Sequence, residues 1–344
     1  MANFVVNSLP DYVENNKEVL LKNFALVGGD TRKRIGVQTG IKKDAYLNYL
    51  DLAPAYADGA SCGWNPSGTA TLTQKTISTA TIKSDMAICP QTLRGKWAEY
   101  LVKTGAGAQT LPFEEYVING FINNVNKDIE TMIWQGDTTK TTDDKLKWFD
   151  GFLTQMVADN DVTKVALSGA DSAYDAIMAV YMAMPEEVLE RGGVIFVSPA
   201  VFRAYTAELE SRNSYYHGVD NADVNEIFLP GTGVKVVKAS GLALPYDSTN
   251  SYQPVSIIGT FAENLVFGTD LEGDAEELKV WYSEDNDEFR LKIRFVAGVA
   301  YHFGDMVVLA NNTTAKADIA SPRSIAKSVA ELADADHVYK TKEQ

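Results

Sequence analysis

The stretch from Leu111 to Gly136 constrains the fold more than any other part of the chain. Thr110 suits an N-cap, Pro112 suits a first helical turn and Gly136 suits a left-handed stop. Apolar residues recur between them at the three- and four-residue intervals of one helix face, at Ile118, Ile122, Val125, Ile129, Met132 and Ile133. The spacing predicts a helix over 111–136 that spans roughly 37 Å, about twice the usual length, and stiffens a thin, wide subunit.

Composition sets the class of protein. A chain of 344 residues, 45% hydrophobic and 22% charged, is typical of a globular protein with one large core or two modest ones. No apolar run approaches the roughly 18 residues of a membrane span. The first residues lack the basic and apolar regions of a signal peptide. We therefore expect a protein that is made and kept in a cytoplasm, without a membrane partner.

The charge is strongly negative and uneven. A net charge of −15 repels nucleic acid on average and argues against a sequence-reading DNA binder. Nine acidic residues lie between Asp270 and Arg290, whereas the N-terminal region carries cations at Arg32, Lys33, Arg34, Lys42 and Lys43. Opposite signs on separate segments suit contacts between neighbouring copies, and two solvated faces are the alternative interpretation.

The N-terminal third reads as extended. Residues 1–58 scatter apolar side chains between turn signals and predict an arm that lies across the subunit or a neighbour. Residues 59–92 are rich in Thr and Ser and alternate around 69–73, which predicts a long two-stranded hairpin. Because an isolated hairpin is marginal in water, it must lean on something, either another subunit or its own core.

The rest of the chain reads as mixed helix and strand. Residues 93–104 predict a short helix before the long one, and residues 162–254 predict an alternating α/β unit. Ser172 with Asp175 resembles a capping box, and Ser198 followed by Pro199 predicts a helix start after the strand 194–198. From Val255 to the strand 306–310 the pattern is β, and a tail follows.

Motifs for catalysis are missing from the sequence. The three histidines, His217, His302 and His337, stand far apart, and none has a metal-binding spacing. We find no nucleophile elbow, Walker loop or dinucleotide fingerprint. Cys62 and Cys89 are too few for a disulfide framework, although one pairing or two free thiols remain open.

One acidic run offers a metal hypothesis. Asp270, Glu272, Asp274 and Glu276 alternate, and on an extended chain their carboxylates would share one face and suit Ca²⁺. The spacing does not match an EF-hand loop, so a solvated acidic face is favoured. We therefore expect no metal, no cofactor and no catalytic residue, and a building block rather than an enzyme.

The order of these elements resembles the major capsid protein of tailed bacteriophages, with its α+β Hong-Kong-97-like fold. The resemblance covers about residues 9 to 310 and lies in LPDYVENN (9–16), the hairpin 59–92, FEEYVINGFINNVNKDIETMIWQGD (113–137), FDGFLTQM (149–156), GGVIFVSPAVFRAYTAEL (192–209) and the strands from 256 to 309. It implies an N-terminal arm (1–58), an extended hairpin loop (59–92), a peripheral domain with a spine helix (93–161), an axial domain (162–254), peripheral return strands (255–304), and a last axial strand with a tail (305–344).

The resemblance also implies a function. Copies would assemble as hexamers and pentamers into an icosahedral head shell, in a virion that is assembled in the host cytoplasm. Partners would be other copies, a portal, possibly scaffold or decoration proteins, and packaged double-stranded DNA bound without sequence specificity. The arm begins almost at Met1, so assembly would use a separate scaffold or none. A covalent crosslink is not carried over, because no residue-level match supports one.

Candidate contact residues between subunits follow from these segments. Arg32, Lys33 and Arg34 would meet acidic residues of a neighbour or face DNA, and the loop around 211–223 would lie near a rotation axis. The full set is Arg32, Lys33, Arg34, Trp64, Thr73, Lys75, Ile77, Lys83, Tyr215, Tyr216, Glu276 and Glu277. Two alternatives stay open: an encapsulin-like nanocompartment shell that encloses enzymes, and an α/β enzyme with an unrecognised site.

Overall fold

A computed structural model describes most of the chain between residues 31 and 311. The described residues are 31–41, 43–53, 55–56, 68–89, 113–167, 172–211, 225–243, 255–270, 277–286 and 288–311. The predicted cap Thr110, the predicted helix 93–104, the loop 212–224 and the tail after 311 lie outside them.

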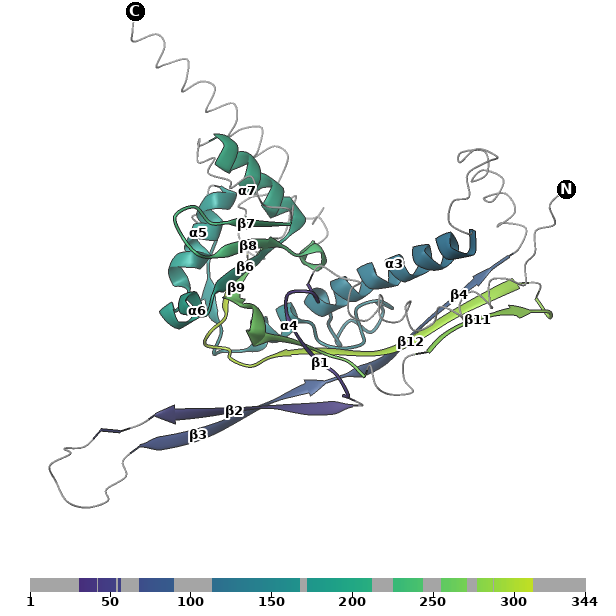
Figure 1. Cartoon of the computed structure of the whole chain (residues 1–344), viewed down its shortest axis with the longest axis horizontal. Coiled ribbons are helices and arrows are strands. Elements are labelled where there is room, and N and C mark those ends of the chain that lie inside the picture. The colour runs from purple at the N-terminus through teal and green to yellow at the C-terminus, as the bar shows by residue number, and fades with distance from the viewer. Residues whose placement is uncertain are drawn as a thin grey trace, which may run out of the picture.

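A long helix over an elongated sheet forms one part of the molecule (Figure 1). The sheet runs in the order β1-β10-β12-β11, and β4 pairs with β12 beside this path. Its strands are β1 (Gly36–Gln38), β4 (Ala80–Ile88), β10 (Leu265–Gly268), β11 (Glu277–Ser283) and β12 (Glu288–Tyr301). The helix, α3 (Phe113–Gln135), shares one buried core with the inner faces of β4, β11 and β12.

The predicted long helix is confirmed. It has 23 residues, or about 34 Å at 1.5 Å per residue. The six periodic apolar residues named from Ile118 to Ile133 are all buried, in one core cluster with Phe289, Leu291 and Ile293, which alternate along β12. Among the described helices, none combines the length and the apolar character that a bilayer crossing requires.

The second part is an α/β unit with a six-stranded sheet of order β5-β13-β9-β6-β8-β7. Its strands are β5 (Thr163–Val165), β6 (Gly193–Val197), β7 (Glu226–Phe228), β8 (Lys235–Lys238), β9 (Ser256–Phe261) and β13 (Val308–Asn311). Helices α5 (Ala173–Ala183), α6 (Glu186–Glu190) and α7 (Pro199–Ser211) belong to it, and α4 (Phe152–Ala158) precedes β5. Two short 3₁₀ turns, η2 (Ser240–Leu242) and η3 (Ala262–Asn264), follow β8 and β9.

One strand lies in a different sheet from the one expected. We expected Ser256–Phe261 among the return strands of the first part, but β9 pairs with β6 on one side and β13 on the other. All six of its residues are buried, which suits a central strand covered on both faces. The predicted helix caps are confirmed: Ser172 accepts a hydrogen bond from the Asp175 N–H, and Ser198 accepts one from the Val201 N–H.

The extended hairpin uses other strands than 59–92. β3 (Thr69–Ser78) pairs along its whole length with β2 (Asp44–Ala53), a segment that we assigned to the arm. β4 turns away after Thr79 and pairs with β12. The reason lies in the side chains, because β4 places Ile82 in the core beneath α3, whereas β3 is mostly polar. Together β2 and β3 form a two-stranded ribbon that projects from the body (Figure 1).

The two parts of the molecule meet at the C-terminal end of α3. The η2 turn packs on this end, and Gln135 donates hydrogen bonds from its side-chain amide to the carbonyl oxygens of Gly241 and Ala243. Gly241 lies so close to the helix that a side chain has no space there. A β-carbon at this position would lie 2.0 Å from the Glu130 carbonyl oxygen and 2.5 Å from Trp134 Cδ1.

Gly241→Ala tests this close approach. We expect the free energy of unfolding to fall by about 1–3 kcal/mol, because η2 must move away from α3. Urea denaturation of the unassembled chain measures the change. Gly233→Ala is the matched control, since a β-carbon there meets nothing within 4 Å, and it should shift stability by less than about 0.5 kcal/mol. Equal shifts for both variants would contradict the packing argument.

Candidate functional site

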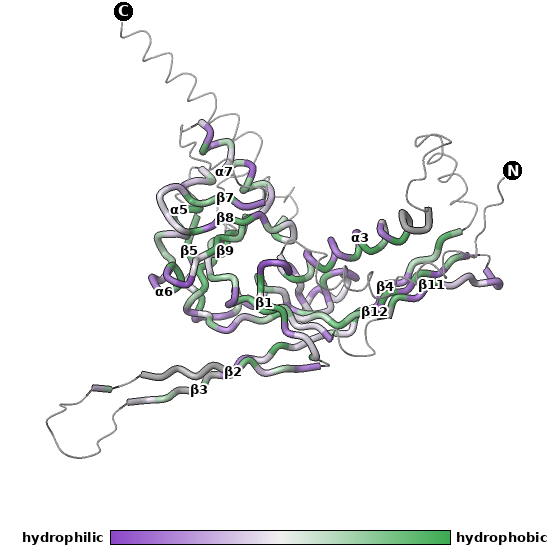
Figure 2. Tube along the Cα trace, in the orientation of Figure 1, coloured by the Kyte–Doolittle hydropathy of each residue, from purple (hydrophilic) through white to green (hydrophobic). Residues whose placement is uncertain are grey.

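The ribbon leaves one face uncovered. Tyr46 of β2 lies opposite Thr76, and Tyr46 and Leu72 are 60% and 68% exposed. Figure 2 shows the ribbon running out from the body, with mixed hydropathy over its coloured part. A two-stranded hairpin with such a face is marginally stable alone, because it buries too little apolar surface. The exposed apolar side chains therefore mark a surface suited to contact with another molecule.

The opposite face is anchored at its base. Leu47 and Ile77 are buried in a small cluster with Ile41, Val266 and Ala300 of the body. The turn between β3 and β4 is held by Thr79, whose N–H and hydroxyl both donate to the Lys43 carbonyl oxygen, at 2.8 and 2.7 Å. The base of the ribbon is thus fixed to the body, while its outer face is free of these contacts.

An ion pair ties the ribbon to the body farther out. Lys75 Nζ lies 3.0 Å from Asp159 Oδ2 and 3.9 Å from the centre of the Tyr301 ring. The Tyr301 hydroxyl donates to the same Asp159 oxygen at 2.6 Å. Burial alone would raise the pKa of Asp159, but hydrogen bonds from Tyr301, the Asp161 N–H and Lys75, with the Lys75 charge, hold it at about 2.

The first described residues are clamped onto α3. Arg32 is buried; its Nε lies 3.3 Å from Glu130 Oε1, and its Nη2 donates to Asn126 Oδ1 at 2.9 Å. The Thr31 N–H donates to Glu130 Oε2, and the Trp134 indole N–H donates to the Thr31 hydroxyl at 2.9 Å. This network satisfies a buried charge on each side and fixes where the arm joins the body.

Arg34 and Glu226 link the same segment to the α/β unit. The two side chains form a close ion pair, and Lys235 Nζ lies 3.3 Å from the other Glu226 oxygen. Burial would raise the pKa of Glu226, but hydrogen bonds from Arg34 and Lys235 outweigh it and lower the pKa below its ordinary value. These partners lie within one chain, and contact of Arg32 and Arg34 with a neighbour or with DNA stays a prediction.

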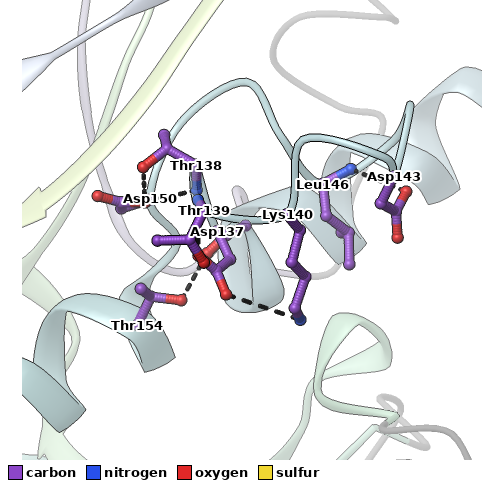
Figure 3. A network of polar contacts seen from close by, with 9 residues as sticks. Asp137, Thr138, Thr139, Lys140, Asp143, Leu146, Asp150 and Thr154 are labelled. Carbon is purple, nitrogen blue, oxygen red and sulfur yellow. Dashed lines mark hydrogen bonds and ion pairs between the residues drawn. The ribbon is translucent and has the colours of Figure 1, made fainter.

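A polar loop over 137–150 follows α3 (Figure 3). Asp137 Oδ1 accepts hydrogen bonds from the N–H and hydroxyl of Thr139, at 3.0 and 2.6 Å. Asp150 Oδ1 accepts from the N–H and hydroxyl of Thr138, both at 2.8 Å. The Thr139 hydrogen bonds lower the pKa of Asp137 from its usual value. These contacts give the loop a defined shape without a regular element.

A hollow of about 300 Å³ separates this loop from the base of the ribbon. Thr76, Ser78 and Thr79 line it on the ribbon side, and Trp148 and Asp150 line it on the loop side. Trp148 is 37% exposed, so the rim offers one large aromatic surface. The hollow, the loop and the ribbon together form the candidate interaction surface of the chain.

The remaining predicted contact residues fall into three groups. Lys33 and Lys83 are exposed, Lys83 forms an ion pair with Asp85, and contact with a neighbour remains a prediction for both. Ile77 is buried in a cluster of its own chain, and its contact with a neighbour stays a prediction. Thr73 of β3 lies opposite Tyr49 of β2, and Glu277 of β11 lies opposite Arg294 of β12. The other predicted contacts lie outside the described residues: Trp64, Tyr215, Tyr216 and Glu276.

Sequence reasoning missed the residues that hold the ribbon and the arm. Glu130 was one more acidic residue on a helix, and Asp159 and Tyr301 stood in unrelated segments. Their partners are 84 to 142 residues away, so no local pattern indicates them. A local signal did exist around Tyr46. Residues 44–50 suit a β-strand that could pair with β3.

Titratable groups elsewhere show no catalytic arrangement in the part of the chain that the structure describes. His302 is half-buried, and burial lowers the pKa of its imidazole. Cys89 is an exposed free thiol, whereas Cys62, His217 and His337 lie outside the described residues. Within those residues no group of three or more His, Cys, Asp or Glu side chains is placed to hold a metal ion, and Glu272, Asp274 and Glu276 are not among them.

Solved structures of capsids match the chain over most of its length. The satellite phage P4 procapsid that includes the size determination (Sid) protein matches with a TM-score of 0.54 and 12% identity, over 86% of this chain and 98% of that one. The capsid of an empty GTA particle matches with a TM-score of 0.51 and 13% identity, over 83% and 90%. Mycobacterium phage Ogopogo matches with a TM-score of 0.52 and 10% identity, over 83% and 92%.

The fold is that of the tailed-phage major capsid proteins. The resemblance stated from the sequence is thereby confirmed at the level of the fold. No family model and no curated protein sequence matches the chain. At sequence identities of 10–13%, the structural match establishes a shared fold and nothing more. The function of this chain must be argued from its own surface.

Arg32→Met tests the clamp on α3. Removing one partner of a buried pair leaves the Glu130 carboxylate uncompensated, and we expect the free energy of unfolding to fall by about 3–5 kcal/mol. The double variant Arg32→Met with Glu130→Leu should recover most of this loss. Lys145→Ala is the control, because its ion pair with Asp128 is exposed and should be worth less than about 1 kcal/mol. A loss as small as the control's would contradict the clamp.

The low pKa of Asp159 predicts a pH dependence. Because folding lowers this pKa from 3.8 to about 2, its contribution is complete above pH 4 to 5 and is lost as the pH falls through 2. The full contribution is about 2 kcal/mol. Asp159→Asn should therefore flatten the acid side of the stability profile, measured by urea denaturation from pH 7 to pH 2. An unchanged profile, or an NMR-measured Asp159 pKa near 4, would contradict the ion pair with Lys75.

Proposed function

We propose that this chain is the major capsid protein that assembles the icosahedral head shell of a tailed double-stranded DNA bacteriophage. The observation that carries the proposal is the ribbon β2–β3, which projects with Tyr46 and Leu72 exposed from a body that has the capsid fold. A subunit whose most extended part lacks a covering layer is incomplete alone. Identical neighbours supply that layer at every position of a closed shell.

In this proposal each part of the chain has a role in the shell. The α3 layer is the peripheral domain, the α/β unit is the axial domain near a rotation axis, and the ribbon lies over a neighbouring copy. Hexamers and pentamers build the shell, and many weak contacts repeated between copies give avidity. Lys33, Lys75 and Lys83, with Trp64, Thr73, Tyr215, Tyr216, Glu276 and Glu277, remain candidate contacts. The chain is a structural component of the virion and not an enzyme.

Other partners follow from the same role. The shell encloses double-stranded DNA without sequence specificity, and it joins a portal, and a scaffold or decoration protein where the phage uses one. Assembly takes place in the host cytoplasm. A nanocompartment shell of the same fold would enclose enzymes instead. The phage interpretation is supported by the matched structures with TM-scores above 0.5, which include a satellite phage procapsid, the capsid of a GTA particle and a mycobacterium phage.

Electron microscopy and analytical ultracentrifugation of the purified chain test the proposal. A shell protein gives closed particles in the megadalton range or discrete hexamers and pentamers. Particles recovered from the native host distinguish the two shells, because a head contains DNA and a nanocompartment contains enzyme cargo. A chain that sediments as a compact monomer under all salt and pH conditions would overturn the proposal.

The exposed face of the ribbon provides a sharper test. Tyr46→Thr with Leu72→Thr keeps β-branched side chains in both strands but removes the apolar surface. We expect the unassembled variant to keep its stability within about 0.5 kcal/mol and to lose particle formation. Particle yield by electron microscopy and far-UV circular dichroism measure the two effects.

Met182→Gln is the matched control for the ribbon variant. Met182 is 76% exposed on α5 of the α/β unit, so the change removes a similarly exposed apolar side chain away from the ribbon. The control should assemble like the wild type. Normal assembly of the ribbon variant would show that the ribbon does not make the contact.

A further inference from the structure

One carboxylate in the loop 137–150 has no cation beside it. The three lysines of the loop each pair with another carboxylate: Lys140 with Asp137, Lys145 with Asp128 and Lys147 with Asp144. Asp150 Oδ1 accepts both hydrogen bonds from Thr138 (Figure 3), and Oδ2 has no hydrogen bond or ion pair with any residue that the structure describes. The negative charge of Asp150, which is half-buried, is therefore not neutralised within the described part of the subunit.

The Asp150 hollow, the space of about 300 Å³ between this loop and the base of the ribbon, is lined by groups that accept hydrogen bonds. Its described lining contains the hydroxyls of Thr76 and Ser78 and the amide of Gln155, but no lysine, arginine or histidine. Gln155 donates both side-chain N–H groups to backbone carbonyl oxygens, so its Oε1 remains to accept. Trp148 donates its N–H to its own loop and offers only its ring. An ammonium or guanidinium group, which donates hydrogen bonds and binds aromatic rings, fits this lining.

An exposed cation without a carboxylate lies near the N-terminal end of the described chain. Lys33 is at the corner of a turn in which the Thr31 carbonyl oxygen accepts hydrogen bonds from the N–H groups of Arg34 and Ile35, at 2.9 and 3.2 Å. The Lys33 side chain makes no ion pair or hydrogen bond with any other described residue. The arginines on either side, Arg32 and Arg34, are held by a buried and a half-buried carboxylate. The turn is thus fixed in advance, so a contact of Lys33 orders only one side chain.

We propose that Lys33 of one copy places its ammonium group in the Asp150 hollow of a second copy, which deepens the proposed shell function and rests on it. The lysine brings three N–H donors and a positive charge to a lining that offers a carboxylate, other acceptors and an aromatic ring. The shapes also match, because a residue at the corner of a turn projects and the hollow is concave. Lys127, another exposed lysine without a described partner, lies on the side of α3 instead.

The Asp150 hollow adjoins the surface that the shell proposal assigns to a neighbour. Thr76 and Ser78 line the hollow from β3, and Thr76 lies opposite Tyr46 on the uncovered face of the ribbon. A copy that covers this face therefore also reaches the hollow. The contact adds a charged edge to an apolar surface, as protein interfaces do, and it fixes the register of the two copies. Because the pair is only partly buried, it weakens as the ionic strength rises.

The two groups stay apart within one copy. Lys33 does not line the hollow of its own chain, and no ion pair joins it to Asp150. Each subunit therefore carries one separate site that gives the cation and one that receives it. Two complementary sites on the same chain let every copy bind a neighbour in the same way, which a closed assembly of identical subunits requires.

Cross-linking of mixed particles tests the contact. Particles are assembled from equal amounts of unlabelled and ¹⁵N-labelled chain and treated with a carbodiimide, which joins lysine amines to carboxylates in contact. We expect linked peptides that join Lys33 to Asp150, with mixed-label pairs as frequent as same-label pairs. Same-label pairs alone would overturn the contact between copies. A link from Asp150 to Lys43, whose carbonyl oxygen is bound by Thr79 at the edge of the hollow, would overturn it too.

A double-mutant cycle tests the same contact by function. Lys33→Met removes the cation, and Asp150→Asn removes the charge but keeps the oxygen that Thr138 requires. Each variant should raise the critical concentration for assembly by about fivefold, and the double variant should raise it no further, because both remove one interaction. Urea denaturation of the unassembled variants should match the wild type. Lys127→Met makes the same change in net charge on α3 and should leave the critical concentration unchanged.

The outcomes separate this inference from the proposed function. Wild-type particles in which Lys33 links to another carboxylate, or reacts only after nuclease treatment, overturn the contact and leave the shell proposal intact. Additive effects of Lys33→Met and Asp150→Asn, or an equal effect of Lys127→Met, also overturn the contact alone. A wild-type chain that never forms particles overturns both proposals.

Discussion

Trp134 is the side chain on which the arrangement of the whole body depends. It is fully buried in the last turn of α3, and its ring lies 5.3 Å from the Phe152 ring and 5.4 Å from the Phe196 ring. A buried indole must also place its N–H on an acceptor, and here the acceptor is the Thr31 hydroxyl. One residue therefore fixes the long helix against the α/β unit and sets where the N-terminal segment crosses it. The close approach of Gly241 follows from the same packing, because the η2 turn covers the remaining side of the ring.

The ribbon contrasts with this well-packed centre. Its base is fixed by buried apolar contacts at Leu47 and Ile77 and by the Lys75–Asp159–Tyr301 contacts, whereas its outer face is covered by nothing in the same subunit that the structure describes. Contacts within the chain thus fix the base of the ribbon and the direction in which it projects. The burial that would make the outer ribbon stable must come from another molecule. A projecting ribbon with a fixed base and an uncovered outer face is suited to an assembly in which every neighbour occupies a fixed position.

The parts predicted correctly from the sequence are those with local signals. The α3 helix follows from its periodic apolar residues, and the starts of α5 and α7 follow from Ser172 and Ser198, because a cap and its acceptor are neighbours in the chain. Strand partners were predicted less well, since 44–53, 69–78 and 80–88 all alternate and alternation does not specify which two segments pair. The buried partner of Arg32 was not predicted for a related reason: Glu130 is 98 residues away, and only the folded core brings them together.

Burial separates two kinds of charged contact in this molecule. The Arg32–Glu130 pair is sealed from water, so it is insensitive to salt and costs much to break, which suits a joint that must hold in every state of the subunit. The cations on the outer face of the sheet β4–β12–β11 are exposed or half-buried, so each contact they make is weak, screened by salt and reversible. A shell that grows by correcting misplaced subunits requires contacts of the second kind between copies and contacts of the first kind within each copy. Among the described residues, the buried Arg32–Glu130 pair joins the N-terminal segment to α3, whereas the Lys83–Asp85 and Arg290–Glu288 pairs lie at the sheet surface, a distribution that agrees with the proposed shell.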